Sequence, residues 1–202
     1  MYIDRPLKDY FEDLAARTPA PGGGSAAALA AATGVSLMSM VANYTIGNPK
    51  YKEFEERIAN ISLKAEQARS ALLGLIDEDV LAYSRLSKAM KDKPKGSPEL
   101  EEAFKDALTP PFEICKIASD CLRHCALLAD LGNKNLITDT AIAAIMLEGA
   151  FFSAKFNVYI NLKYIKDIDY VGRIHGVLAP LEEELPKLKE EILEKCEDVI
   201  AK

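Results

Sequence analysis

The sequence predicts an all-α protein, a single-domain bundle of long, largely antiparallel helices that covers residues 1–202. Two observations support this fold class. Apolar residues recur three and four positions apart through most long windows, which is the spacing of one helix face. No segment shows sustained alternation of apolar and polar residues, the pattern of a half-buried strand. The chain also has no internal repeat and no interdomain linker, as expected for one bundle with short loops.

Three helices are predicted in the first half of the chain. Apolar residues between Leu7 and Leu14 indicate a short first helix, and an alanine-rich stretch from Ser25 to about Ile46 indicates a second. The third has the clearest pattern and ends near residue 91 before a Pro-Gly segment. One apolar stripe runs along it through Tyr51, Phe54, Ile58, Ile61, Ala65, Ala68, Leu72, Leu75, Asp79, Ala82 and Leu86.

A fourth helix is predicted to begin at Ser97 as its N-cap and to end near Gly132. Pro110 and Pro111 lie inside it and should kink or split it, because proline removes a backbone donor. A fifth helix is expected from about Thr138 to Lys163.

The last helix is expected from about Asp167 to Ile200. It is amphipathic, and prolines at positions 180 and 186 should break it.

Composition limits the class of protein. A hydrophobic content of 49% and a charged content of 28% are typical of soluble globular proteins. The net charge of -6 argues against a nucleic-acid partner, since such binding needs a basic face. Residues 1–13 carry charges where a signal peptide needs an apolar core, and Glu148 and Lys155 interrupt the apolar stretch 140–160. We therefore expect a cytoplasmic protein with no membrane segment.

Asp79 departs from the pattern of the third helix, because it occupies a position on the apolar stripe where leucine or isoleucine is expected. A buried carboxylate is costly unless it is paired, and burial raises its pKa, which suits a general acid or base. Tyr83 follows one turn later on the same face. A structural acid bonded to a neighbouring helix is an equally good interpretation of Asp79 from the sequence.

The fifth helix carries a second polar anomaly, since a stripe of small residues on it ends in two asparagines. Asn157 and Asn161 place amides in a seam where helices approach closely, and hydrogen bonds between helices explain them slightly better than ligand binding. Asp139 begins the same stripe and is simplest as a first-turn acid beside an N-cap at Thr138. Asp139 and Asn157 are roughly 27 Å apart along a straight helix, so they contact different ends of a ligand or different sites.

Two other groups of residues invite functional interpretations. Cys121, His124 and Cys125 share one arc of the fourth helix, but three ligands are a weak zinc signal, and we expect no metal. All four cysteines are expected to be reduced thiols. His175 is expected to be structural, and the acidic run 182–184 to be a solvated face.

The segment 18–25 is rich in proline and glycine and leads directly into the second helix, so its free N–H groups could bind an anion or a polar ring. Close packing of backbones is the alternative explanation of three consecutive glycines. The segment lacks the Lys-Ser/Thr ending of a phosphate-binding loop and the preceding strand of a dinucleotide fingerprint.

Taken together, these segments resemble the formiminotetrahydrofolate cyclodeaminase and methenyltetrahydrofolate cyclohydrolase family. The blocks occur in the family's order over nearly the whole chain: Thr18-Pro19-Ala20-Pro21-Gly22-Gly23-Gly24-Ser25, Met40-Val41-Ala42-Asn43, Asp79 with Ala82-Tyr83, Gly132-Asn133-Lys134-Asn135, Thr138-Asp139, and Asn157-Val158-Tyr159-Ile160-Asn161-Leu162. The resemblance implies an all-helical homodimer that acts on folates without a metal or other cofactor, as a stand-alone cyclodeaminase domain.

The resemblance also implies roles for individual residues. It assigns Asp79 as the catalytic proton acceptor, and it places the substrate beside Gly22, Gly23, Gly24, Ser25, Tyr83, Asn133, Asp139, Asn157 and Asn161. A lysine should meet the anionic glutamate tail of folate, with Lys50, Lys134 and Lys163 as the candidates.

The expected reaction converts 5-formiminotetrahydrofolate to 5,10-methenyltetrahydrofolate and ammonia. Methenyltetrahydrofolate cyclohydrolase activity is the first alternative, and a non-catalytic helical interaction protein is the second.

Overall fold

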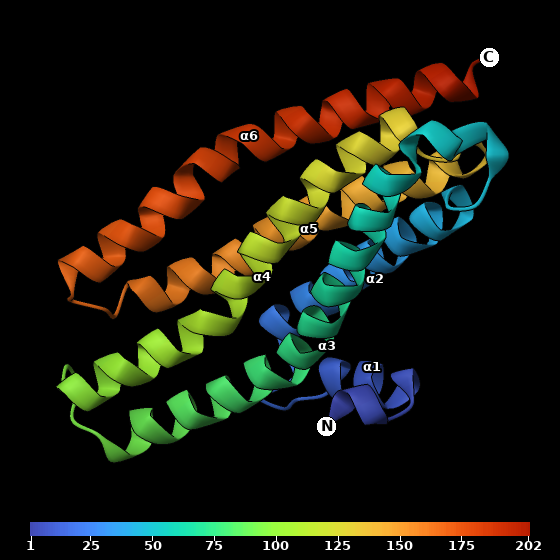
Figure 1. The fold of residues 1–202 in the computed structure, drawn as a ribbon. Helices are drawn as coiled ribbons and strands as arrows, with labels where there is room; N and C mark the ends of the chain where they lie inside the picture. Colours follow the sequence, from blue (N-terminus) through green and yellow to red (C-terminus); the bar gives the residue numbers. More distant parts are fainter.

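The computed structural model describes residues 1–202 and confirms an all-helical chain with no strand. Six α-helices make up the bundle (Figure 1): α1 (Leu7–Ala15), α2 (Gly23–Thr45), α3 (Glu55–Asp92), α4 (Pro98–Leu131), α5 (Ile137–Leu162) and α6 (Ile168–Ile200). Three short 3₁₀ segments complete it: η1 (Tyr2–Asp4), η2 (Pro49–Phe54) and η3 (Lys134–Leu136).

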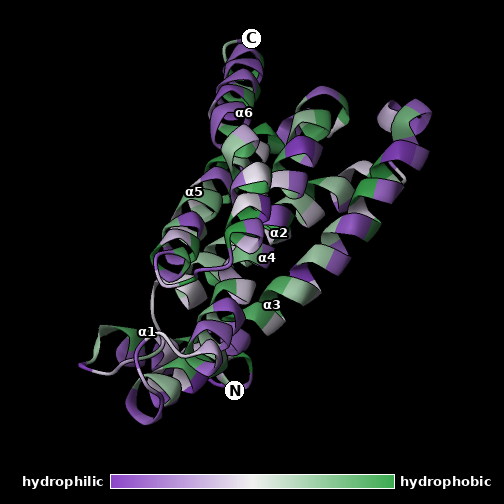
Figure 2. Ribbon diagram, turned by 90° about the vertical axis from the view of Figure 1, so that its left-hand side faces the viewer, coloured by the Kyte–Doolittle hydropathy of each residue, from purple (hydrophilic) through white to green (hydrophobic).

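The core is built around α2, which packs against both α3 and α5, while α4 packs on α3 and α5 and α6 covers α4 and α5. Small side chains allow the close approach of α2 and α5. A β-carbon at Gly34 would lie 3.2 Å from the backbone oxygen of Ala143 and 3.1 Å from the side chain of Leu147. Hydrophilic and hydrophobic residues alternate along α3 and α6 (Figure 2), as expected for helices with one buried face.

Two helical stretches, Gly23–Thr45 and Lys134–Leu162, are long and apolar enough to cross a membrane by length and composition alone. Both contribute many side chains to the core of the bundle, and the core helices of folded proteins commonly meet the same criterion.

Both long helices in the middle of the chain change direction (Figure 1), so the second half of α3 and the first half of α4 extend together as an arm. Pro110 and Pro111 lie inside α4, which bends without splitting because its hydrogen-bonded turns continue on both sides. The predicted N-cap Ser97 is confirmed, since its side chain accepts a hydrogen bond from the backbone N–H of Leu100 at 3.2 Å.

The structure corrects several predicted helix ends. Helix α2 begins at Gly23, so two of the three glycines are already helical, and the first residues of the predicted third helix form η2. Thr138 is not an N-cap, because η3 runs directly into α5 and the residue before the helix is Leu136. The prolines at 180 and 186 do not break α6. Pro180 and Gly176, whose carbonyl it leaves unpaired, are both exposed, so water can satisfy that carbonyl.

Candidate active site

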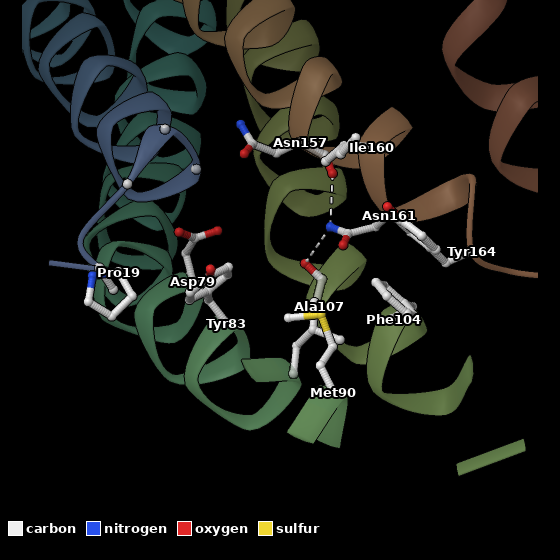
Figure 3. Close-up of a pocket in the computed structure, with 15 residues that line it drawn as sticks. Pro19, Asp79, Tyr83, Met90, Phe104, Ala107, Asn157, Ile160, Asn161 and Tyr164 are labelled. Carbon is white, nitrogen blue, oxygen red and sulfur yellow. Dashed lines mark hydrogen bonds between the residues drawn. The ribbon is translucent and has the colours of Figure 1, made fainter. Parts of the chain in front are cut away.

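A cavity of about 290 Å³ lies between the start of α2, the middle of α3, the first half of α4 and the end of α5 (Figure 3). The residues that line it include Asp79 from the apolar stripe of α3, the three glycines 22–24, and the asparagines at positions 157 and 161. Its wall is formed by Pro19, Ala20, Gly22, Gly23, Gly24, Asp79, Tyr83, Leu86, Met90, Phe104, Ala107, Asn157, Ile160, Asn161 and Tyr164.

Asp79 reaches the cavity from α3, with its carboxylate turned towards the start of α2 (Figure 3). Its Oδ2 atom accepts a hydrogen bond from the backbone N–H of Ser25 at 2.9 Å. Burial raises the pKa of this carboxyl to about 6, and the bond from Ser25 opposes the rise without cancelling it. A carboxyl with such a pKa can both accept and release a proton near neutral pH.

The glycines allow this contact. A β-carbon at Gly24 would lie 2.0 Å from Asp79 Oδ1, and one at Gly23 would lie 3.4 Å from Asn157 Nδ2. The N-cap residue of α2 is Gly22, which has no side chain to bond the free N–H groups of the first turn. Asp79 therefore caps α2 from another helix, and the N–H groups of Gly23 and Gly24 have no partner within the protein.

Ser25 was expected beside the substrate, but its side chain does not line the cavity. Its side chain is fully buried, and its Oγ accepts a hydrogen bond from the hydroxyl of Tyr10 at 3.2 Å. Tyr10 belongs to α1, so the short first helix supports the glycine segment from behind. The role of Ser25 shown by the contacts is to hold Asp79 through its backbone N–H.

The two asparagines lie on α5 opposite Asp79 (Figure 3). Asn157 Nδ2 donates to the carbonyl of Ser153 at 3.1 Å, and Asn161 Nδ2 donates to the carbonyl of Asn157 at 2.9 Å. Asn161 also donates to the carbonyl of Ala107 on α4 at 3.5 Å. Neither Oδ1 atom accepts a hydrogen bond from these helices, so both oxygens remain free to accept one from a ligand.

The other end of the cavity is apolar and aromatic. Tyr83 lies one turn beyond Asp79 and is 40% exposed, and Leu86 and Met90 continue the same face of α3. Phe104 and Tyr164 stack with ring centroids 4.5 Å apart and planes inclined by 12°. The spacing of the α3 stripe already pointed to Leu86, but no local pattern marked Phe104 or Tyr164, which come together only through the arm of α4.

A second hollow of about 550 Å³ adjoins the first, and Met90, Phe104 and Tyr164 line both. The rest of its wall contains three lysines, at positions 95, 163 and 166, together with Gly96, Leu100 and Glu101. Of the three lysines considered for an anionic tail, the structure brings only Lys163 near the cavity.

Asn133 and Asp139 do not line the cavity. Asn133 is buried before η3, where its Oδ1 caps the backbone N–H of Asn135 at 3.1 Å and its Nδ2 donates to the carbonyl of Tyr44. Lys134 donates to the last carbonyls of α4, at Ala129 and Asp130. These residues belong to the opposite end of α5, as the 18-residue separation of Asp139 and Asn157 required.

The cysteines are buried free thiols, and burial raises the pKa of Cys121 and Cys125. The structure has no group of three or more histidine, cysteine, aspartate and glutamate side chains placed to hold a metal. His124 lines a surface hollow between α3 and α4. His175 packs against the ring of Tyr159, with centroids 5.4 Å apart.

The acidic run on α6 is not simply solvated. Glu182 accepts hydrogen bonds from Tyr159 and Lys155, and Glu184 accepts two from Arg123, at 2.8 and 2.7 Å. The prediction was wrong because the run spans the face by which α6 contacts α4 and α5. Only Glu183 makes no such contact.

Comparison with known proteins agrees with this geometry. A family model described as formiminotransferase-cyclodeaminase matches residues 6–179. The chain is 32% identical over 184 residues to a methenyltetrahydrofolate cyclohydrolase of Methylorubrum extorquens, covering 86% of this chain and 88% of that protein. It is 32% identical over 190 residues to the formimidoyltransferase-cyclodeaminase of Mus musculus, where the match covers 90% of this chain and 35% of that longer protein.

A solved structure has the same fold over the whole chain. The crystal structure of formiminotetrahydrofolate cyclodeaminase from Thermotoga maritima has a TM-score of 0.93 and 30% sequence identity, covering 99% of this chain and 100% of that one. The relatives named here are enzymes, which argues against a non-catalytic interaction protein. The chain therefore belongs to the formiminotransferase-cyclodeaminase family and is a folate enzyme of the cyclodeaminase and cyclohydrolase type.

Proposed function

We propose that this protein converts 5-formiminotetrahydrofolate to 5,10-methenyltetrahydrofolate and ammonia. The observation that carries the proposal is a partly buried carboxylate, Asp79, with a pKa of about 6, facing two asparagine amides across a cavity open to a ring-sized ligand. The free N–H groups of Gly23 and Gly24 and the free Oδ1 atoms of Asn157 and Asn161 supply both donors and acceptors. A pterin edge offers the complementary groups.

The proposed chemistry needs two proton transfers and one carboxylate. The N10 nitrogen of the folate attacks the carbon of the formimino group, whose terminal nitrogen is protonated, and forms the N10–C bond of a tetrahedral intermediate. Asp79 accepts the proton that N10 loses and then delivers it to the departing nitrogen. The bond between the carbon and that nitrogen breaks, ammonia leaves, and the cationic methenyl ring remains. The ionised Asp79 carboxylate then stabilises that cation electrostatically.

A cyclohydrolase is the alternative, favoured by the similarity to the Methylorubrum extorquens protein over 88% of its length. In that reaction water replaces ammonia as the group exchanged at the same carbon. The same carboxylate would carry the same protons, so Asp79 is assigned one role in both reactions.

We assign the tail of the substrate to the second hollow. The stacked rings of Phe104 and Tyr164 lie where the two hollows meet, which suits the aromatic ring of folate. Beyond them, Lys95, Lys163 and Lys166 provide positive charge for a carboxylate-bearing tail.

We also propose a cytoplasmic homodimer that needs no metal or other cofactor and binds neither nucleic acid nor membrane. Free cysteine thiols suit a reducing compartment.

Along one face of α5, four apolar side chains are exposed by 46%, 51%, 70% and 48%: Ile142, Ile145, Phe156 and Ile160. This face is proposed to meet a second copy, and light scattering of Ile145→Lys against the wild type tests it. A wild-type monomer overturns the dimer. Asn133 and Asp139 remain predicted contacts of a separate site.

Turnover of each substrate decides the activity. Purified protein is given 5-formiminotetrahydrofolate, or 10-formyltetrahydrofolate and its methenyl partner, and the absorbance of the methenyl product is followed. Asp79→Asn should lose turnover while keeping the circular dichroism of a helical protein. The control, Asp92→Asn at the exposed end of the same helix, should retain turnover. Absence of turnover with every substrate would overturn both enzymatic assignments.

A further inference from the structure

The backbone of α4 presents an unpaired carbonyl to the cavity. In an α-helix, the carbonyl of Ala107 would accept a hydrogen bond from the N–H of residue 111. That residue is Pro111, which has no N–H, so the helix leaves this oxygen without its usual partner. Ala107 lines the cavity, and Pro111 itself is buried behind it.

Asn161 uses this oxygen. Its Nδ2 group donates one hydrogen to the carbonyl of Asn157 at 2.9 Å and the other to the carbonyl of Ala107 at 3.5 Å (Figure 3). Because both donors point at carbonyl oxygens, the reversed amide would set its own oxygen against two acceptors. The amide is therefore held in one orientation, with Oδ1 left to accept a hydrogen bond from whatever occupies the cavity.

We infer that Pro111 is a positioning residue: by leaving the Ala107 carbonyl unpaired, it fixes the Asn161 amide so that its Oδ1 accepts a hydrogen bond from an N–H group of the bound folate. This inference rests on the proposed function, since it supplies the ligand. A site built to accept a hydrogen bond discriminates strongly against a ligand that lacks the donor, because the buried acceptor is then left unpaired.

The neighbouring proline, Pro110, is a control that distinguishes positioning of Asn161 from bending of α4. Pro110 frees the carbonyl of Asp106 in the same way, but Asp106 does not line the cavity, and its side chain pairs with Arg85 outside it at 2.7 Å. Replacement of either proline by alanine restores one hydrogen bond to the same bend of α4. Only the change at 111 adds a competing N–H donor at the carbonyl that Asn161 uses.

The test is a double-mutant cycle on kcat/KM. We expect Pro111→Ala to lower kcat/KM about tenfold, as for the loss of one hydrogen bond, and Pro110→Ala to change it by less than about twofold. In an Asn161→Ala background, Pro111→Ala should have no further effect, because its target is already gone. Thermal unfolding of each variant confirms that it is folded before its kinetics are compared.

If Pro111→Ala lowers kcat/KM by the same factor in the wild type and in the Asn161→Ala background, the inference is overturned. The proposed function still stands in that case, because the wild type remains an active folate enzyme. Unchanged kcat/KM in Pro111→Ala overturns the inference as well. If Pro111→Ala does not fold, Asn161→Asp tests the same contact, since a carboxylate cannot donate to the Ala107 carbonyl, and wild-type kinetics there overturn the inference. A wild type that neither binds nor converts folate overturns the proposed function and this inference together.

Discussion

Asp79 and Gly24 approach each other so closely that a β-carbon at position 24 would lie 2.0 Å from the carboxylate. The two residues are 55 positions apart in the chain, yet the packing of α2 on α3 leaves no room between them for a methyl group. Glycine is therefore required at position 24 by the close approach of the Asp79 carboxylate. It is not required by the backbone conformation, which is that of an ordinary helix.

Gly24→Ala should displace the Asp79 carboxylate and lower kcat. A displacement of about 1 Å at a catalytic group can cost on the order of 100-fold in rate. The matched control is Gly172→Ala on α6, where a β-carbon meets nothing within 4 Å. Steady-state kinetics on both variants check this, and wild-type kcat in Gly24→Ala would show that the carboxylate tolerates displacement.

Stability should depend on pH through Asp79. Its pKa in the folded protein is about 6, above its ordinary value, so folding favours the protonated form and the fold loses stability as pH rises through 6. Asp79→Asn removes that loss, so the free energy of unfolding of the variant relative to that of the wild type should rise by about 2 kcal/mol between pH 4 and pH 8. Denaturant unfolding at both pH values measures the difference, and a constant difference would argue against a raised pKa.

The rate should show the same ionisation. A proton acceptor works as the carboxylate, so kcat/KM should fall on the acid side of about pH 6, by roughly tenfold per pH unit. Ser25 lowers the pKa of Asp79 only through its backbone N–H, so Ser25→Ala should leave the acid limb in place. A rate that is flat from pH 4 to pH 8 would assign the proton transfers to another group.

Reversing the charge of the second hollow should affect binding of the substrate more than chemistry. Lys163→Glu is expected to raise KM several-fold with little change in kcat, because the tail is remote from the reacting carbon. Lys187→Glu, on the exposed surface of α6, is the control for a general charge effect. If added salt does not weaken binding in the wild type, the tail is not held by charge.

Asp77 anchors the N-terminal segment, and its removal should destabilise the protein. It is 5% exposed, and its carboxylate accepts hydrogen bonds from the backbone N–H groups of Tyr2 at 2.6 Å and Ile3 at 3.4 Å. Asp77→Ala leaves these donors unpaired and should cost about 1–3 kcal/mol of unfolding free energy. Asp4→Ala, at an exposed position, should cost much less in the same denaturant titration.

Periodicity predicted the helices well and their ends less well. The stripe on α3 and the capping residue Ser97 are local signals, and the structure confirms both. The interruptions expected at 180 and 186 depend on whether the freed carbonyls reach water, which no local pattern reports. Thr138 is not a cap because the 3₁₀ segment η3 leads directly into α5, and 3₁₀ turns are frequent at the ends of α-helices.

Polar residues that break an apolar pattern marked part of the candidate site, although a structural role explained Asp79 equally well and the two asparagines slightly better. Asp79, Asn157 and Asn161 were all found in that way, and they meet in one cavity. Phe104 follows the ordinary pattern of α4 and Tyr164 lies in the turn after α5, so only the folded structure reveals them as lining residues. The sequence does not predict the role of Asp77, because its partners are backbone groups 74 and 75 positions away and no local pattern reports them.

Asp77 and Asp79 lie within one turn of α3 and hold two different segments, the 3₁₀ segment η1 before α1 and the glycine-rich first turn of α2. Asp77 is the carboxylate that binds the backbone N–H groups of Tyr2 and Ile3, and Asp79 is the one that binds the backbone N–H of Ser25. Opening of this single turn would release both segments at once, so their amide hydrogens should exchange with solvent as one cooperative unit. Ligand bound at the glycine segment would then slow exchange at Tyr2 and Ile3, which it never touches.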